Sequence, residues 1–415
     1  MSPTLRSATG AVERSTNVEG VGSEPASSTG GVSSGSTWLS GPALLVGLSM
    51  PFWRYALVPG VPIEIAVFGL MVAVGAFVRP TVRNPVVPWV ALAFFTMLTS
   101  VIAVSVLMGQ PWLQRSVRLA LLFIVAAVVA QGRVRWKSIL LGGVLSLTFL
   151  NAPAFYLGLT PNNYPPFLTG WLGDKNVAGL YYAVMAVFGL SLFRRGWQQA
   201  AYFATMFALL WLTGSRTGLA AAVLGLGWWL LRNRVGLMTR LALFGLGAWA
   251  LQWFEGRYSQ VGVFADREGT DLLRSSIHTA EQIKLSGTAW YGRGLNTAVV
   301  DLPGFHRMFF HDSYAALQVE GGIPMLVVVL GLYVVLGLGL GSRRRTVGSD
   351  LRAAEGAVIA LLVCAWQLGE VFLTSIGFFL LGVALLQRFG TSVVAPEPQS
   401  PLGSAARGPS VRFES

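Results

Sequence analysis

Charged residues are scarce in this sequence. They make up 12% of its 415 residues, against about 25% in an ordinary soluble domain. Hydrophobic residues make up 53%, and the mean hydropathy is +0.60. A soluble protein needs more charge, because its surface must face water. The composition therefore favours a membrane protein, with the lipid bilayer as its first partner.

Cysteine is almost absent too. The one cysteine, Cys364, lies in an apolar run, which excludes an intramolecular disulfide and a cysteine-rich metal site. No glycine-rich phosphate loop precedes a Lys-Ser or Lys-Thr pair, so ATP hydrolysis is not expected. No Asp-x-Asp or His-x-x-x-His cluster appears between the apolar runs. We therefore expect neither a metal nor a cofactor.

Long apolar runs fill the rest of the chain, and most approach the ~20 residues that cross the hydrocarbon of a bilayer. They predict an all-α fold, a polytopic transmembrane helical bundle of about 12 spans with one large external loop. The expected spans are 38–58, 62–78, 86–108, 116–131, 138–158, 176–193, 198–213, 217–231, 238–254, 313–340, 353–369 and 372–388.

Positive charges are spread in small groups between these runs. The denser groups fall at every second connection, and the positive-inside rule makes those connections cytoplasmic. Both chain ends are then cytoplasmic as well. The net charge of +12 thus indicates orientation in the membrane, and we expect no nucleic-acid partner.

These patterns divide the chain into five regions. Ser, Gly, Thr and Pro dominate the first, and the first long apolar run begins only near Trp38, unlike a cleaved signal peptide. The regions are a disordered cytoplasmic tail (1–37), transmembrane helices 1–9 (38–254), a large external loop (255–312), helices 10–12 (313–390) and a second disordered tail (391–415).

Arg216 is the first candidate for chemistry. It lies in the turn Thr213-Gly214-Ser215-Arg216-Thr217-Gly218 between two apolar runs. An arginine at a membrane edge extends its charge to the interface, pairs with an opposite charge or binds an anion. The small neighbours, Ser215 among them, favour a turn in which backbone N–H groups and the guanidinium meet phosphate oxygens.

His311 is the second candidate, in Phe309-Phe310-His311-Asp312-Ser313-Tyr314 before a long apolar run. One interpretation is an interfacial histidine beside a helix cap formed by Asp312 or Ser313. The other is a general base, because imidazole titrates near neutral pH.

The external loop holds further candidates. Arg274 lies in a stretch, 271–285, with helical spacing that suggests a helix along the membrane surface. Arg293 lies in the glycine-rich turn Tyr291-Gly292-Arg293-Gly294. On the same side, Asp174 and Asn176 open a span, where such residues are more often helix caps than ligands.

These segments resemble the O-antigen ligase/O-antigen polymerase family of bacterial membrane glycosyltransferases. The similarity covers about residues 170–335 in motif detail and the rest in architecture. The matching pieces are Gly173-Asp174-Lys175-Asn176, the turn around Arg216, Arg274 with Tyr291–Asn296, and His311-Asp312-Ser313-Tyr314 through Glu320-Gly321-Gly322-Ile323. The family usually has Asn at the position of Asp312.

The resemblance implies transfer of a glycan from polyprenyl (undecaprenyl) pyrophosphate to a sugar hydroxyl, without metal or nucleotide. The reaction would serve surface polysaccharide or lipopolysaccharide assembly, on the outer face of the cytoplasmic (inner) membrane. Arg216 and Arg274 would hold the pyrophosphate, with Arg293 assisting, and His311 would be the base. Asn176, Ser215 and Asp312 would line the substrate site. Ligase and polymerase remain alternatives that differ in the acceptor, and a transporter or flippase of lipid-linked sugars is the alternative outside the enzyme class.

Overall fold

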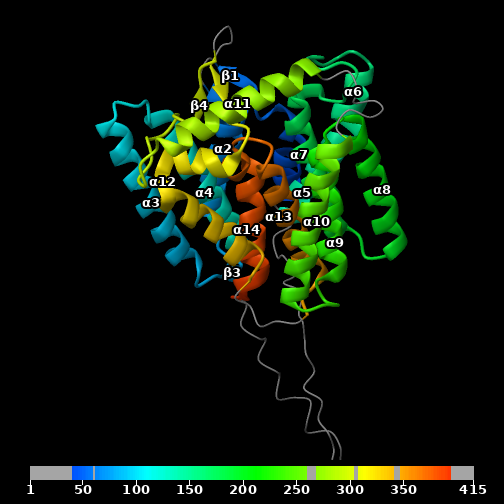
Figure 1. Cartoon of the computed structure of the whole chain (residues 1–415). Helices are drawn as coiled ribbons and strands as arrows, with labels where there is room; N and C mark the ends of the chain where they lie inside the picture. Colours follow the sequence, from blue (N-terminus) through cyan, green and yellow to red (C-terminus); the bar gives the residue numbers. More distant parts are fainter. Residues whose placement is uncertain (1–39, 59–60, 259–267, 303–306, 341–345, 394–415) are drawn as a thin grey trace, which may run out of the picture. The chain divides into compact units, whose positions relative to one another are not determined.

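The computed structural model describes residues 40–58, 61–258, 268–302, 307–340 and 346–393 (Figure 1). Of residues 40, 248, 250–258 and 268–274 it describes the backbone alone. The described residues are 71% helical with few strands, so the expectation of a helical fold is confirmed. The tail expected at 1–37 lies outside the described residues, as does most of the one expected at 391–415.

Fourteen α-helices lie within the described ranges, and apolar residues dominate nearly all of them. They are α1 (Ser40–Leu48), α2 (Ile63–Phe77), α3 (Val87–Leu107), α4 (Leu113–Ala130), α5 (Trp136–Leu145), α6 (Ala152–Tyr156), α7 (Lys175–Phe188), α8 (Gly196–Leu212), α9 (Arg216–Leu231), α10 (Leu237–Tyr258), α11 (Glu268–Ser286), α12 (Ser313–Gly331), α13 (Ser349–Ala365) and α14 (Ser375–Phe389). Short turns of 3-10 helix (η2, Met50–Phe52; η4, Gly170–Leu172; η5, Gly189–Leu192; η8, Val371–Leu373) and of π-helix (η3, Ser146–Asn151; η7, Leu332–Gly337) extend or connect them.

Several of these helices can cross a membrane. Five described segments are long and apolar enough by length and composition: Val87–Leu107, Leu113–Ala130, Trp136–Tyr156, Lys175–Leu192 and Ser313–Gly337. They indicate a helical membrane protein. The other expected ranges also contain helices, but these are shorter or more polar, so the count of twelve spans stays a prediction.

The first expected span, 38–58, is shorter in the structure than the sequence suggested. The helix α1 ends at Leu48, and the chain continues through η2 to a strand, β1 (Ala56–Val58), which pairs with β2 (Val61–Pro62). Pro51 contributes to this ending, because it has no N–H to continue the helix. The hydroxyl of Ser49 also donates back to the carbonyl oxygen of Val46 at 2.8 Å.

The centre of the fold is built around α13, which packs against α7, α9 and α14. Small residues allow this close approach. A Cβ on Gly225 of α9 would lie 2.6 Å from the carbonyl oxygen of Gly356 in α13, and the reverse distance is also 2.6 Å. Any larger side chain at either position would push the two helices apart.

Polar contacts join the segment before α3 to the end of α14 and the strand that follows it. The strand β3 (Val82–Arg83) pairs antiparallel with β6 (Thr391–Ser392), so the region expected as a C-terminal tail begins with a strand. The buried amide of Asn84 donates to the carbonyl oxygen of Leu385 in α14 at 3.0 Å. The start of α3 is thereby fixed to the end of α14.

The segment between α10 and α12 contains the helix expected at 271–285, which is present as α11. Its residue Ile277 is buried against Ala298 and Phe310, so α11 is packed on the chain that follows it. A third strand pair lies there, between β4 (Val299–Val300) and β5 (Met308–Phe309).

Candidate functional site

The helix α12 is interrupted at Gly322, where the backbone has φ 66° and ψ −165°. A Cβ at this position would lie 2.0 Å from the carbonyl oxygen of Trp290, so only glycine fits. Pro324 follows, and its missing N–H is no loss near the start of a helical stretch. The expected span 313–340 is therefore two helical stretches rather than one continuous helix.

The glycine-rich turn 291–294 closes this break. Three backbone hydrogen bonds join the turn to the interrupted helix, and they satisfy groups that a membrane interior would otherwise leave unpaired. The N–H groups of Arg293, Gly294 and Ile323 donate to the carbonyl oxygens of Val319 (2.8 Å), Glu320 (2.9 Å) and Trp290 (2.7 Å). Two motifs that are separate in the sequence thus form one structural unit.

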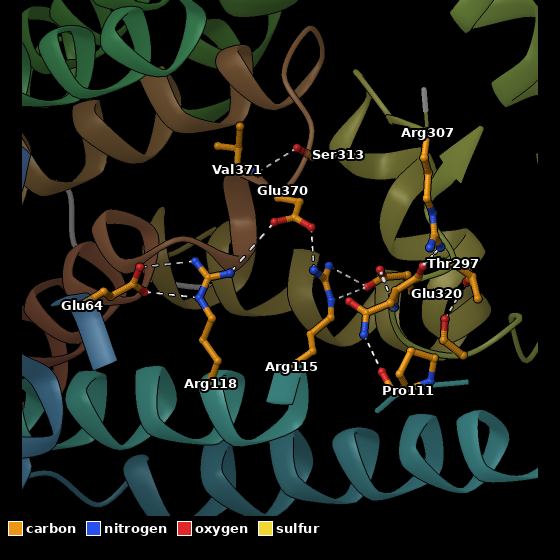
Figure 2. A network of polar contacts seen from close by, with 12 residues as sticks. Glu64, Pro111, Arg115, Arg118, Thr297, Arg307, Ser313, Glu320, Glu370 and Val371 are labelled. Carbon is orange, nitrogen blue, oxygen red and sulfur yellow. Dashed lines mark hydrogen bonds and ion pairs between the residues drawn. The ribbon is translucent and has the colours of Figure 1, made fainter. Parts of the chain in front are cut away.

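A row of five charged side chains lies beside this unit, in the order Glu64, Arg118, Glu370, Arg115 and Glu320 (Figure 2). We refer to it as the charge row. Arg115 bridges two carboxylates, with Nη2 2.8 Å from Glu320 Oε2 and Nη1 2.5 Å from Glu370 Oε1. Arg118 continues the row with longer contacts, at 4.0 Å to Glu370 and 3.4 Å to Glu64.

Burial makes the pairing in the charge row important. The side chain of Glu320 is 2% exposed and that of Arg115 is 11% exposed. Ions removed from water are costly unless each is matched by a partner. Burial alone would raise the pKa of Glu370, but the two neighbouring arginines, Arg115 foremost, outweigh it and lower that pKa. Glu370 is therefore ionised at neutral pH.

The backbone beside the charge row is strained. Among the described residues other than glycine, Asn296 and Glu370 alone have a positive φ, 64° in each case. Glu370 is a member of the charge row, and the N–H of Asn296 donates to Glu320 Oε1 at 3.1 Å. Such a conformation costs about 1–3 kcal/mol and is commonly retained at functional sites. We therefore take this region as the centre of the candidate site.

The cavity at the charge row is small. It is lined by Arg115, Glu320, Glu370 and Ser313 together with apolar side chains, and its water-accessible volume is about 10 Å³. That is room for about one water molecule. The hydroxyl of Ser313 donates to the carbonyl oxygen of Leu368 and accepts from the N–H of Val371. A ligand larger than a water molecule does not fit in this cavity.

His311 lies next to a carboxylate that the sequence analysis did not single out. Its backbone N–H donates to Glu281 Oε1 at 2.5 Å, and its ring Nδ1 is 3.2 Å from the carbonyl oxygen of Phe309. His278 Nδ1 lies 3.6 Å from the other oxygen of Glu281. Burial raises the pKa of Glu281.

Asp312 is the N-cap of α12. Its carboxylate accepts hydrogen bonds from the N–H groups of Tyr314 and Ala315 at 2.7 and 3.2 Å. Burial raises the pKa of this carboxyl, and the two hydrogen bonds oppose that change. The capping interpretation is therefore confirmed for Asp312. The same holds for Asp174, which caps α7 and accepts from the N–H of Asn176 at 2.8 Å.

Ser215 and Arg216 lie where α9 begins. Ser215 is the N-cap of that helix and accepts from the N–H of Gly218 at 3.2 Å. Ser215 also packs against Gly179 of α7, where a Cβ would lie 2.3 Å from its hydroxyl oxygen. The starts of α7 and α9 are thereby neighbours, and they carry Asn176, Ser215 and Arg216.

The two remaining arginines differ in what the structure describes. Arg293 binds the chain that follows α11, with Nη2 2.6 Å from the carbonyl oxygen of Gly287 and Nε 3.0 Å from the hydroxyl of Thr288. Arg274 lies in α11, and the structure describes its backbone but not its side chain. Its approach to Arg216 and His311 stays a prediction.

The charge row itself was missed by the sequence analysis. Its members are isolated in the sequence, and Arg115 and Glu320 are 205 positions apart. The available signal was Arg115 and Arg118, one helical turn apart at the start of an apolar run, where two charges facing one side require partners.

Comparison with known proteins adds no further assignment. No protein-family model matches the chain, and no curated protein matches it. Within the described ranges, no three His, Cys, Asp or Glu side chains are grouped so that they could hold a metal ion.

Proposed function

We propose that the protein is a membrane glycosyltransferase that transfers a glycan from polyprenyl pyrophosphate to a sugar hydroxyl, as O-antigen ligases and polymerases do. The proposal includes about twelve spans with both ends in the cytoplasm. It also includes an active face on the outer side of the cytoplasmic membrane, formed largely by residues 255–312.

The observation that supports it best is the unit formed by the turn 291–294 and the break at Gly322. Both segments resemble motifs of that family, and they are about 30 positions apart in the sequence. Backbone hydrogen bonds join the two segments, and their close approach explains why both contain glycines. Glu320 lies in the half of α12 that precedes the break, and His311 lies immediately before the N-cap of that helix.

The charge row is not suited to bind the pyrophosphate of the donor. The charge row contains three carboxylates and two guanidiniums, so it has no positive charge left for an anionic leaving group. We therefore assign the pyrophosphate to Arg216 and Arg274. The charge row then has a positioning role, since it fixes the break in α12 and the turn against it.

The chemistry needs a base and cations. The acceptor hydroxyl attacks the anomeric carbon of the donor glycan, the new C–O bond forms, and the bond to pyrophosphate breaks with its electron pair on the phosphate oxygen. Arginines stabilise that charge. The hydroxyl proton goes to His311, which in its neutral form carries the lone pair on Nε2 when Nδ1–H donates to Phe309.

The test is glycan transfer in membrane vesicles with an undecaprenyl-pyrophosphate-linked glycan and a sugar acceptor, without ATP or added divalent metal. We expect Arg216→Ala to lose most transfer and Arg216→Lys to restore only part, because lysine makes no bidentate contact. His311→Ala should bind the donor normally and transfer it about 10²–10⁴-fold more slowly. Arg194→Ala, an exposed arginine before α8, is the matched control and should transfer normally.

Two outcomes would contradict the proposal. Normal transfer by both Arg216→Ala and His311→Ala would remove the assigned roles. If the wild-type protein instead moves the lipid-linked glycan across the bilayer of proteoliposomes and forms no glycosidic bond, the transporter alternative holds.

A further inference from the structure

A second cluster of charges lies at the other end of the helices, where α9 and α14 end and α13 begins. At its centre is Glu355 of α13, which is fully buried. Its two oxygens accept from Arg232 Nε at 2.5 Å and from Arg388 Nη2 at 2.7 Å. The indole N–H of Trp228 donates to the same carboxylate at 3.1 Å.

A third arginine belongs to this cluster but does not reach the carboxylate. Arg240, in the first turn of α10, is 7% exposed and lies over the ring of Trp228, 4.8 Å from its centroid. Its Nε and Nη1 are buried and have no hydrogen-bond acceptor among the described residues. Leaving charged donors unsatisfied in a buried position costs free energy, more than it does for neutral donors.

The cluster therefore lacks negative charge. It combines three arginines with one carboxylate, and both oxygens of that carboxylate are already used by Arg232 and Arg388. An anion with free oxygen atoms would supply the acceptors that Arg240 needs. Phosphate is suited to this role, because it accepts two parallel hydrogen bonds from a guanidinium.

The surroundings of Arg240 indicate where such a phosphate comes from. On the same helix, Met238, Leu246 and Trp249 are 76%, 59% and 61% exposed. Exposed apolar side chains on a membrane helix face acyl chains. A phospholipid can therefore place its head group at Arg240 and its chains along α10.

We propose that Arg240 binds the phosphate of an anionic phospholipid, with its acyl chains lying along α10. The positive-inside pattern assigns this connection to the cytoplasmic leaflet, where basic pockets between helices bind anionic lipids. This site is independent of the proposed glycan transfer, which involves the other end of the helices.

The test is native mass spectrometry of the full-length protein purified in detergent and titrated with phosphatidylglycerol, phosphatidylcholine or sodium phosphate. We expect the wild-type protein to bind phosphatidylglycerol at least about 10-fold more tightly than phosphatidylcholine. Arg240→Gln should weaken phosphatidylglycerol binding by about 10- to 100-fold, the loss of a charge-assisted contact. Arg234→Gln removes the same charge from an exposed position nearby and should change binding less than about twofold.

Equal binding of phosphatidylglycerol by wild type and Arg240→Gln would overturn the proposal, as would equal binding of the two lipids by the wild type. Sodium phosphate binding as tightly as the lipid would assign the site to a free anion and overturn the lipid assignment. If Arg240→Gln does not fold, Arg240→Lys replaces it and should also weaken phosphatidylglycerol binding, because lysine makes no bidentate contact; equal binding would overturn the proposal.

Discussion

The two ends of the helices both bury arginines, but they balance the charge differently. The charge row matches Arg115 and Arg118 with three carboxylates, and Arg115 is held between two of them. The cluster at Glu355 provides one carboxylate for three arginines. In the charge row each arginine has at least one carboxylate partner, whereas at Glu355 two arginines share the carboxylate and Arg240 has no acceptor among the described residues. The first end thus has the features of a fixed scaffold and the second those of a binding site.

Removing Arg115 from the charge row should have the largest effect. Arg115→Ala leaves the buried Glu320 without its guanidinium and removes the bridge to Glu370. We expect a loss of about 3–5 kcal/mol in the free energy of unfolding, the usual cost of breaking a buried ion pair. Thermal and denaturant unfolding in detergent would measure it.

Arg118→Ala is the matched control for that variant. Its side chain is 27% exposed and its contacts are 3.4 and 4.0 Å long, so we expect a smaller loss than for Arg115→Ala, although Glu64, 7% exposed, loses its partner. If the two variants were equally stable, the charge row would not be the scaffold that we describe.

The break in α12 offers the next largest effect. Gly322→Ala places a Cβ against the carbonyl oxygen of Trp290 and forces a side chain into a positive φ. We expect at least about 1–3 kcal/mol of destabilisation, together with reduced glycan transfer. Unfolding and transfer measured on the same preparation would check this.

Gly331→Ala is its control on the same helix. Nothing lies within 4 Å of a Cβ there, so alanine should be neutral or stabilising by about 0.5–1 kcal/mol. Destabilisation of both variants to the same extent would mean that glycine is needed throughout α12 and not at the break in particular.

The smallest effect should come from a substitution in the cluster at Glu355. In detergent without anionic lipid, Arg240→Gln removes a surplus charge and should change the free energy of unfolding by about 1 kcal/mol or less, in either direction. With phosphatidylglycerol present, the wild-type protein should become more stable than the variant, because the ligand binds its folded state. A large loss without lipid would show that Arg240 is already matched within the protein.

Much of the helical fold was predictable from the sequence. Apolar runs gave nearly every helix to within a few residues, and the capping roles of Asp174 and Asp312 followed from their positions before apolar runs. These features depend on neighbours within one or two turns. The shortened first span was missed because apolar residues continue past Leu48, although the helix ends there.

The candidate site was less predictable, because its contacts join distant positions. Glu320 was visible as part of a motif, but its pairing with Arg115 depends on how α4 and α12 pack. The same is true of Glu281 beside His311, where the carboxylate comes from α11 and meets a backbone N–H. No local pattern encodes such a partner.

The hydrogen bond between Asn84 and Leu385 bears on the order of events during synthesis. The two residues are 301 positions apart. A ribosome adds about 5–20 residues per second, so roughly 15–60 s separate the synthesis of the amide from that of its acceptor. During that interval the strand β3 also lacks its partner β6. A nascent chain that stops before α14 therefore leaves the early helices in the membrane without the contacts that complete them, and such chains should be the preferred substrates of membrane proteases.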